Sequence, residues 1–160
     1  MIDIVTADLR NQAHAEATVK LLNHYSRDAM GGGQDLPAFV QENLVGELLR
    51  RPGAHVVLAY SDQTPVGLVI LMEGFSTFAC KPLLNIHDLV VLSDFRGQGI
   101  SQKLLQKSEE IAKSLGCCKL TLEVLEGNTT AQAAYKASGF AGYELDPQMG
   151  KALFWQKKLS

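Results

Sequence analysis

Residues 89–101 read LVVLSDFRGQGIS, and this segment is the most informative part of the chain. It begins inside an apolar run over residues 86–92, whose leucine and β-branched side chains predict a central, buried strand. A short polar turn follows, and from Gly99 the apolar side chains repeat at helical spacing as far as Leu115. The segment therefore predicts a buried strand that passes through a glycine-containing turn into a long amphipathic helix.

The glycines of this turn favour the binding of a phosphate. Gly97 and Gly99 allow successive backbone N–H groups to face one concave surface, and Arg96 adds a cation beside them. The first turn of the following helix adds unpaired N–H groups and the positive end of the helix dipole. A pyrophosphate requires these features, although two glycines at this spacing are also typical of an ordinary tight turn.

Two other kinds of phosphate-binding loop do not fit. A dinucleotide-binding fingerprint that begins at Gly97 would need glycine at position 102, where the chain has Gln102. A nucleotide-triphosphate loop would end in Gly-Lys-Ser/Thr, which this segment lacks. The loop also lies beyond the middle of the chain, whereas a Rossmann loop follows the first strand. A Rossmann-type nucleotide enzyme is therefore disfavoured.

Around this segment, hydrophobic periodicity predicts a mixed α/β sheet in one domain over residues 1–160. Four helices are predicted, one between residues 12 and 30 and the others over residues 37–50, 100–115 and 129–138. Seven strands are predicted, over residues 2–5, 54–60, 65–72, 86–92, 117–125, 140–145 and 151–158. The glycines at positions 31–33 predict a flexible loop or a mobile wall of a pocket.

The composition of the chain excludes several classes of protein. Its 160 residues are 46% hydrophobic and carry a formal charge of −2, without the basic surplus that is usual in nucleic-acid binding. No apolar run reaches the roughly 20 residues that cross a bilayer, and the N-terminus lacks the regions of a signal peptide. Cys80, Cys117 and Cys118 fit neither a disulfide framework nor a zinc-binding spacing. We expect a cytoplasmic protein with no metal, nucleic-acid or membrane partner.

Two motifs resemble those of the GNAT superfamily of N-acetyltransferases. Residues 96–101 are similar to its Gln/Arg-x-x-Gly-x-Gly/Ala signature, with Ser101 in place of the last small residue and Ser93 where proline is common. Every fixed position of its Asn-x-x-Ala-x-x-x-Tyr-x-x-x-Gly-Phe pattern is matched, by Asn128, Ala131, Tyr135, Gly139 and Phe140. The Ser101 hydroxyl can still donate to a phosphate oxygen, and Ser93 loosens the turn without removing it. The resemblance covers nearly the whole chain and is most specific over residues 86–140.

The resemblance implies the GNAT fold, a mixed and mostly antiparallel sheet of about seven strands, flanked by about four helices and splayed between strands 4 and 5. It implies direct transfer of an acetyl group from acetyl-CoA to an amine of a small molecule or peptide in a ternary complex. The cofactor-binding residues it implies are Leu89, Val90 and Val91 for the pantetheine arm, Arg96, Gly97, Gln98, Gly99, Ile100 and Ser101 for the pyrophosphate, and Asn128 and Tyr135. A homodimer is common in the family.

Three kinds of catalytic group follow from the resemblance. Tyr135 matches the family's general acid, which protonates the departing thiolate, although it could instead be a packed, half-buried aromatic. His87 stands nine residues before Arg96, where polyamine acetyltransferases have an acidic base, and histidine titrates near neutrality. It could equally be a core histidine with satisfied hydrogen bonds. Asp88 could orient His87 or bind a cationic substrate, and Glu123 is a third candidate for the base.

The acceptor site is expected in residues 25–36 and 73–78, in segments from which the family usually builds it. Phe75 and Phe78 could wall an amine site or make core or dimer contacts. A second class of function stays open, a CoA-binding regulatory module that has kept the phosphate loop and lost turnover. The lack of an acidic residue at position 87 leaves that alternative open, whereas the presence of Tyr135 favours the enzyme.

Overall fold

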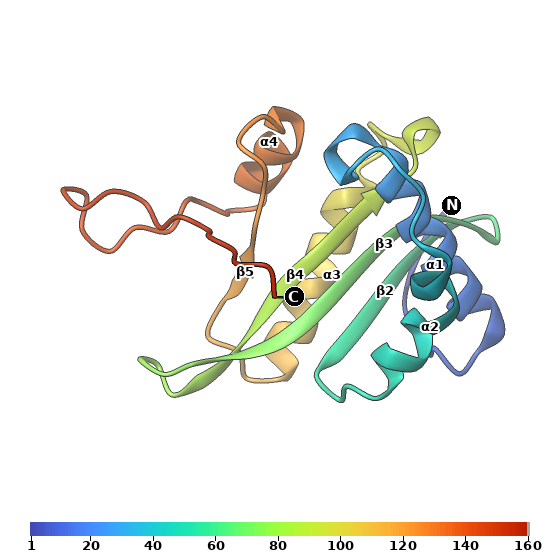
Figure 1. The fold of residues 1–160 in the computed structure, drawn as a ribbon, viewed down its shortest axis with the longest axis horizontal. Coiled ribbons are helices and arrows are strands. Elements are labelled where there is room, and N and C mark those ends of the chain that lie inside the picture. The colour runs from blue at the N-terminus through green and yellow to red at the C-terminus, as the bar shows by residue number, and fades with distance from the viewer. Residues whose placement is uncertain (160) are drawn as a thin grey trace. The chain divides into compact units, whose positions relative to one another are not determined.

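The computed structural model describes residues 1–159 and divides into two compact units. The first unit spans Met1–Leu122, and the second begins at Glu123. Figure 1 follows the chain through both. In the described part of the chain, no helix is both long enough and apolar enough to span a membrane.

The first unit is built on a sheet of five strands. In chain order they are β1 (Ile2–Thr6), β2 (Ala54–Ser61), β3 (Thr64–Ser76), β4 (Lys81–Val91) and β5 (Leu120–Leu122). They lie side by side in the same order, antiparallel from β1 to β4 and parallel between β4 and β5 (Figure 1). The prediction of a mixed, mostly antiparallel sheet is confirmed.

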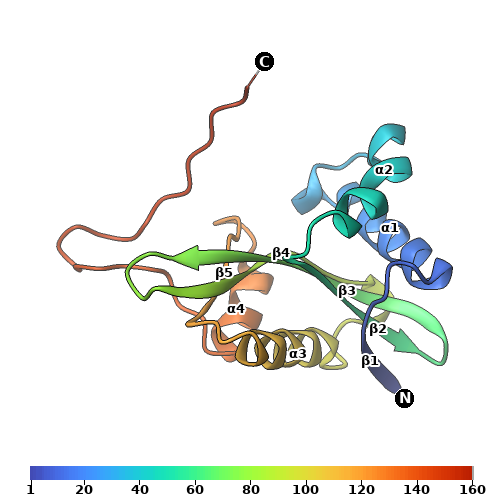
Figure 2. The same cartoon turned by 90° about the horizontal axis from the view of Figure 1, so that it is seen from below.

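Three helices pack on the two faces of this sheet. They are α1 (Gln12–Arg27), α2 (Ala38–Leu49) and α3 (Ile100–Ser114), and a short 3-10 turn, η1 (Ala29–Gly31), follows α1. Figure 2 shows α1 and α2 on one face and α3 on the other. Each of these three helices agrees with a predicted one.

Alternating side chains of the inner strands fill two core layers. The layer against α1 and α2 contains Ala17, Leu21, Leu48, Val56, Leu58, Leu68, Ile70 and Val90. On the opposite face, the buried side chains of α3 include Ile100 and Leu104. At Gly67 of β3 the helix comes so close that a Cβ atom would lie 3.0 Å from Leu104 Cδ1. This close packing fixes α3, and with it the loop that precedes α3, against the sheet.

A β-bulge interrupts β4 where the sequence predicts a regular strand. Two successive pairs across β3 and β4 are Ile70 with Asp88 and Leu71 with Ile86, so His87 is an extra residue. Pairing with β5 ends at Ile86, just before the bulge. Among the described residues, no strand pairs with the outer edge of β4 from His87 onward. Pairing between the fourth and fifth strands thus stops just before the bulge, and the expected splaying of these two strands stays a prediction.

β5 is shorter than the strand predicted over residues 117–125. Gly116 ends α3 in a left-handed conformation with φ 73°. The N–H groups of Cys117 and Cys118 then donate to the carbonyls of Ala112 and Pro82, each at 2.9 Å. These residues form the exit turn of α3, and only Leu120–Leu122 pairs with β4.

The second unit contains α4 (Thr129–Ala137), which agrees with the helix predicted over residues 129–138. The final strands predicted over residues 140–145 and 151–158 do not form as strands. Only an isolated bridge pairs Glu144 with Lys151 in this part of the described chain. Residues 1–159 therefore contain five strands rather than about seven.

The failed prediction has a physical reason. The alternating apolar side chains near the C-terminus are typical of a strand, but a strand also needs a neighbouring backbone edge for its N–H and C=O groups. Beyond the bridge, those side chains stay exposed, at 75% for Phe154 and 83% for Trp155. Side-chain pattern alone does not indicate whether such an edge is present.

Candidate functional site

The predicted phosphate loop leads from β4 into the N-terminus of α3. A single 3-10 turn, η2 (Ser93–Phe95), carries the chain from β4 to Arg96. Gly97 and Gly99 adopt left-handed backbone conformations with φ 77° and 75°, which favour glycine. No described side chain caps α3, which begins after Gly99, so its first N–H groups are available to a ligand. This local geometry is that of an anion-binding site.

The predicted loop residues contribute in different ways. Gln98 is exposed, and Ser101 is half-buried in the first turn of α3. Ile100 is 1% exposed, so its side chain anchors the helix in the core. Val90 of β4 is also in the core, at 3% exposed, between the half-buried Leu89 and Val91. Ile100 and Val90 can therefore offer a ligand only their backbone groups.

The Arg96 side chain has two partners within the first unit. Its Nε donates to the carbonyl of Val91 at 3.4 Å, and Nη2 lies 3.9 Å from Oδ2 of Asp28. Arg96 therefore links the phosphate loop both to the end of β4 and to the turn that follows α1. Asp28 lies 68 positions before Arg96 and belongs to no motif, so no sequence pattern predicts this contact.

His87 is exposed at the bulge, so its interpretation as a core histidine is wrong. Its Nδ1 is hydrogen-bonded to the side-chain oxygen of Asn85, whose amide nitrogen donates to Thr121 Oγ1 at 2.8 Å. Because the Asn85 oxygen can only accept, Nδ1 of His87 carries the proton. The neutral imidazole then has its lone pair on Nε2. Asn85 and Thr121 pair across two parallel strands, and no motif in the sequence identifies either residue.

Asp88 is half-buried and shares the sheet face that α1 covers. Burial raises the pKa of Asp88 above its ordinary value, and the nearby charge of His87 opposes this rise. The Asp88 carboxyl also acts on the pKa of Tyr25, which lies in the last turn of α1. The pKa of Tyr25 is raised first by burial and then by the negative charges of Asp88 and Asp28. Asp88 and Asp28 thus lie close enough to Tyr25 for both of their charges to act on its hydroxyl.

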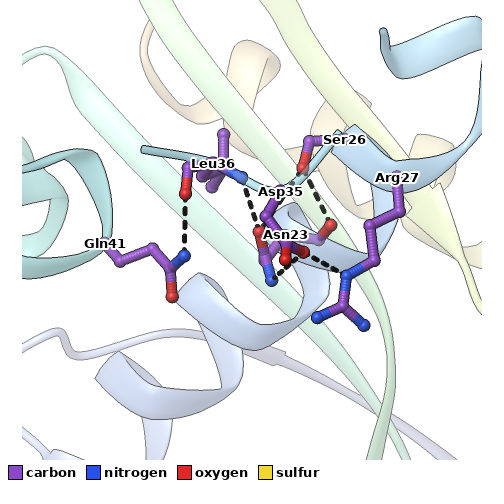
Figure 3. Close-up of polar contacts among 6 residues, drawn as sticks. All are labelled: Asn23, Ser26, Arg27, Asp35, Leu36 and Gln41. Atoms are coloured by element: carbon purple, nitrogen blue, oxygen red, sulfur yellow. Dashed lines mark hydrogen bonds and ion pairs between the residues drawn. The ribbon is translucent and has the colours of Figure 1, made fainter. Parts of the chain in front are cut away.

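Polar contacts fix the loop between α1 and α2, as Figure 3 shows. The side chain of Asn23 accepts from the N–H of Leu36 at 2.7 Å and donates to Oδ1 of Asp35 at 3.2 Å. Asp35 also pairs with Arg27, and Gln41 of α2 donates to the carbonyl of Leu36 at 2.8 Å. The loop is therefore tied to both helices.

The three glycines of this loop form a hydrogen-bonded tight turn, whereas its predicted flexibility stays a prediction. A Cβ atom at Gly31 would lie 2.1 Å from the carbonyl oxygen of Tyr25, so only glycine fits there. Gly32 and Gly33 have φ values of 112° and 76°. The N–H groups of Gly31 and Gly33 donate to the carbonyl of Asp28, each at 2.9 Å. The turn holds Asp28 in a fixed position after α1.

The two phenylalanines expected to wall an acceptor site lie at the hairpin between β3 and β4. Phe75 is 60% exposed and Phe78 is 97% exposed, so neither is a core residue. Phe75 pairs with Pro82, whereas Asp88 pairs with Ile70. The five-residue spacing along β3 corresponds to about 16 Å. The structure does not bring these phenylalanines to Asp88.

Within the second unit, Asn128 and Tyr135 have local structural roles. The Asn128 side chain accepts from the N–H of Ala131 at 3.2 Å, so Asn128 is the N-cap of α4. Tyr135 is half-buried, and its ring packs edge-on against Phe140 with centroids 5.9 Å apart. Glu123 is exposed at the start of this unit. Contacts of Asn128 and Tyr135 with coenzyme A stay predictions.

A groove of about 770 Å³ lies between α1 and α2 and extends to the segment after β4. Its polar lining includes Lys20, Arg27 and Glu42. None of the described residues that line it belongs to the predicted catalytic or cofactor-binding set. Its lining nevertheless includes Leu92, Ser93 and Asp94, which lie in the segment between Val91 and Arg96.

Comparison with known proteins identifies relatives of this chain. A model of the acetyltransferase (GNAT) family matches residues 18–140. The thialysine N-epsilon-acetyltransferase of Bos taurus is 36% identical over 98 residues, which cover 60% of this chain and 53% of that protein. An aminoglycoside N(6′)-acetyltransferase type 1 of Acinetobacter genomosp. 13 is 30% identical over 97 residues, covering 58% and 66%. The chain spans about half the length of the thialysine acetyltransferases it matches.

Solved structures share the fold. An aminoglycoside acetyltransferase from an uncultured soil metagenomic sample, in complex with trehalose, matches with a TM-score of 0.80 at 18% identity, over 99% of this chain and 97% of that one. The ribosomal-protein-alanine N-acetyltransferase of Brucella melitensis matches with a TM-score of 0.70 at 22% identity, over 99% and 98%. At these identities the likeness shows the fold alone.

Proposed function

The chain belongs to the acetyltransferase (GNAT) family, and on that premise we propose that it transfers an acetyl group from acetyl-CoA to a primary amine of a small molecule or peptide. The observation that carries this proposal is the loop before α3. There Gly97 and Gly99 leave the backbone N–H groups of a helix N-terminus available, and Arg96 supplies a cation. A Cβ atom at either glycine would meet nothing within 4 Å, so the loop has room for a ligand.

The residues that would hold acetyl-CoA follow from this loop and from β4. Residues 96–101 would bind the pyrophosphate through backbone N–H groups, Arg96 and the Ser101 hydroxyl. Leu89, Val90 and Val91 would pair with the pantetheine arm, because no strand among the described residues pairs with that edge of β4 beyond Ile86. When bound, acetyl-CoA supplies the thioester that the amine attacks. Asn128 would add a contact from the second unit.

His87 is the proposed base. An alkylammonium ion must lose a proton before its nitrogen can attack, and Nε2 of His87 holds the lone pair that accepts it. Asn85 and Thr121 keep the imidazole in this tautomer. Glu123 remains an alternative base, acting through water.

Two further groups complete the proposed chemistry. A backbone N–H of β4 would stabilise the negative charge that develops on the carbonyl oxygen during attack. The Tyr135 hydroxyl would donate its proton to the sulfur as the C–S bond breaks, and the second proton that the acetylated nitrogen loses would restore the hydroxyl. The transfer then yields the acetylated amine and free coenzyme A.

The charges near Tyr25 support a cationic acceptor. Asp88 and Asp28 both act on Tyr25, so two carboxyl groups place negative potential there. The relatives are named for amine-bearing substrates, thialysine and aminoglycosides. The proposed acceptor is a primary amine, with Asp88 attracting its ammonium form. Homodimerisation and a cytoplasmic location stay predictions.

The proposal is tested by incubating the chain with acetyl-CoA and a panel of primary amines while free thiol release is followed. We expect thiol release that depends on the amine, together with calorimetric binding of coenzyme A. Absence of coenzyme A binding would overturn the proposal. Binding without thiol release for any amine in the panel would favour the alternative, a CoA-binding regulatory module.

A further inference from the structure

We propose that Asp28 competes with coenzyme A for Arg96, so that the ion pair between these side chains limits how tightly the phosphate loop binds its ligand. The inference rests on the proposed function, because it takes residues 96–101 as the pyrophosphate site. Asp28 lies in the turn after α1 and belongs to neither motif, and it would act on the ligand through Arg96.

The turn presents one carboxylate oxygen of Asp28 to the phosphate loop. The Asp28 carbonyl accepts from the N–H groups of Gly31 and Gly33, each at 2.9 Å, which fixes the backbone. Oδ1 accepts from the N–H of Met30 at 2.9 Å and thereby caps η1. Oδ2 does not take part in this cap, and it lies 3.9 Å from Nη2 of Arg96. The two oxygens therefore have separate partners.

The ion pair is weak enough to be exchanged for a phosphate contact. The side chain of Arg96 is 61% exposed and that of Asp28 is 42% exposed, and ion pairs at such exposure contribute little. A pyrophosphate carries more negative charge than one carboxylate, and it also accepts from the N–H groups at the start of α3. Arg96 therefore turns from Asp28 to the pyrophosphate when coenzyme A binds.

Both consequences of this exchange weaken the binding of coenzyme A. The contact with Asp28 must be lost before Arg96 is fully available, and the carboxylate that remains repels the phosphates. The first effect requires Arg96, whereas the second acts without it. Asp28 should therefore weaken the binding of coenzyme A mainly through Arg96.

The test is a double-mutant cycle on coenzyme A binding, measured by calorimetry at low ionic strength. Asp28→Asn removes the charge and keeps a side-chain oxygen that can cap η1. We expect it to tighten binding about two- to fivefold, the range that exposed ion pairs give. The gain should be clearly smaller in a chain that also carries Arg96→Gln. It should also shrink at 0.5 M NaCl, because salt screens exposed charges.

Asp35→Asn is the matched control. It removes the same charge from the same loop, but Asp35 pairs with Arg27 rather than with Arg96. We expect its affinity for coenzyme A to equal that of the unmodified chain.

Three outcomes overturn the inference. Unchanged or weaker binding by Asp28→Asn removes the competition, and an equal gain with and without Arg96→Gln reduces it to simple repulsion. Failure of the unmodified chain to bind coenzyme A overturns the proposed function and this inference together. If thermal unfolding shows that Asp28→Asn does not fold, Asp28→Ser, which also retains a capping oxygen, repeats the measurement.

Discussion

Nδ1 of His87 donates to the side-chain oxygen of Asn85, and Asn85 is fixed in turn by its hydrogen bond to Thr121. The bulge takes His87 out of the alternation of β4, so its imidazole is exposed while Asp88 shares the face covered by α1. One extra residue thus separates an oriented imidazole from a half-buried carboxyl group. The two side chains can therefore be substituted separately, although the charge of His87 still lowers the pKa of Asp88.

The first prediction concerns His87 as the base. We expect kcat/KM of the unmodified chain to rise with pH, because only the neutral imidazole can accept a proton from the amine. His87→Ala should lower kcat/KM by about 10²- to 10⁴-fold and flatten this rise, because no group at that position accepts the proton. The measurement is a pH profile of thiol release with the best amine of the panel.

His87→Gln and Asn85→Ala are the companion variants. His87→Gln keeps a hydrogen-bonding side chain without its titration, so it should also flatten the rise. Asn85→Ala leaves the base but frees its ring, so it should lower kcat and keep the pH dependence. If both His87 variants retain the rise, the base is not His87, and Glu123 or Asp88 becomes the candidate.

Gly99 gives a prediction about coenzyme A binding. Gly99→Val forces a β-branched residue into φ 75° and directs its side chain into the space left for the ligand. We expect calorimetry to show no measurable coenzyme A binding, with a loss of about 1–3 kcal/mol in the free energy of unfolding. Undiminished affinity in the folded variant would show that this loop does not bind the pyrophosphate.

Gly46→Ala is the matched glycine control. Gly46 lies inside α2, and a Cβ atom there would meet nothing within 4 Å. Alanine in a helix interior should raise the free energy of unfolding by about 0.5–1 kcal/mol and leave coenzyme A affinity unchanged.

Tyr135 should affect turnover more than binding. Its proton is needed only as the thiolate leaves, so Tyr135→Phe should lower kcat by about 10- to 1000-fold with little change in coenzyme A affinity. Phenylalanine also keeps the aromatic packing against Phe140, whose ring lies edge-on to Tyr135. Single-turnover kinetics measure the chemical step directly, and an unchanged rate would remove the proposed role of general acid.

The part of the fold that could be predicted is the part whose signal is local. α3 follows from a helical stripe between two glycines, Gly99 and Gly116, and both adopt left-handed conformations at its ends. The final strands failed because strand formation depends on a partner edge that side-chain alternation does not reveal. The bulge at His87 is also invisible in a sequence, because an extra residue changes pairing without changing residue type.

In the candidate site, too, the features with a local sequence signal could be predicted and the contacts between distant residues could not. Gly97 and Gly99 mark the turn before α3 in the sequence, and both adopt left-handed conformations that favour glycine. Asn85 with Thr121, and Asp28 with Arg96, are contacts between ordinary polar residues far apart in the chain. Their side chains carry no periodic or motif signal, so only the fold brings them together.

Asn23 gives a prediction about the loop between α1 and α2. Asn23→Ala removes the acceptor of the Leu36 N–H and one donor to Asp35, so we expect a loss of about 1–3 kcal/mol in the free energy of unfolding. Asn43→Ala is the control, because the exposed Asn43 side chain donates only to the carbonyl of Phe39 in its own helix. Urea unfolding of both variants measures the two losses in free energy of unfolding. Equal losses would contradict the proposal that Asn23 stabilises the loop between α1 and α2.

Asp88 gives the last prediction, which concerns stability and pH. Burial raises the pKa of the folded Asp88 carboxyl above its ordinary value near 3.8. Below that value both the folded and unfolded states are protonated, and the carboxyl has no net effect. As the pH rises toward the raised pKa, the unfolded state loses its proton first, so stability is lost.

Asparagine does not titrate, so Asp88→Asn removes this loss. We expect the free energy of unfolding of Asp88→Asn, relative to that of the unmodified chain, to be higher at pH 7.5 than at pH 3.5. Urea unfolding of both chains at the two pH values measures this difference. The charge of His87 lowers the pKa of Asp88, so His87→Gln should raise it further in an NMR titration of the carboxyl carbon. An equal difference between Asp88→Asn and the unmodified chain at both pH values would contradict the shift. Asp88→Asn also removes the carboxylate that would attract the acceptor's ammonium. The stabilised variant should therefore show a higher KM for the amine.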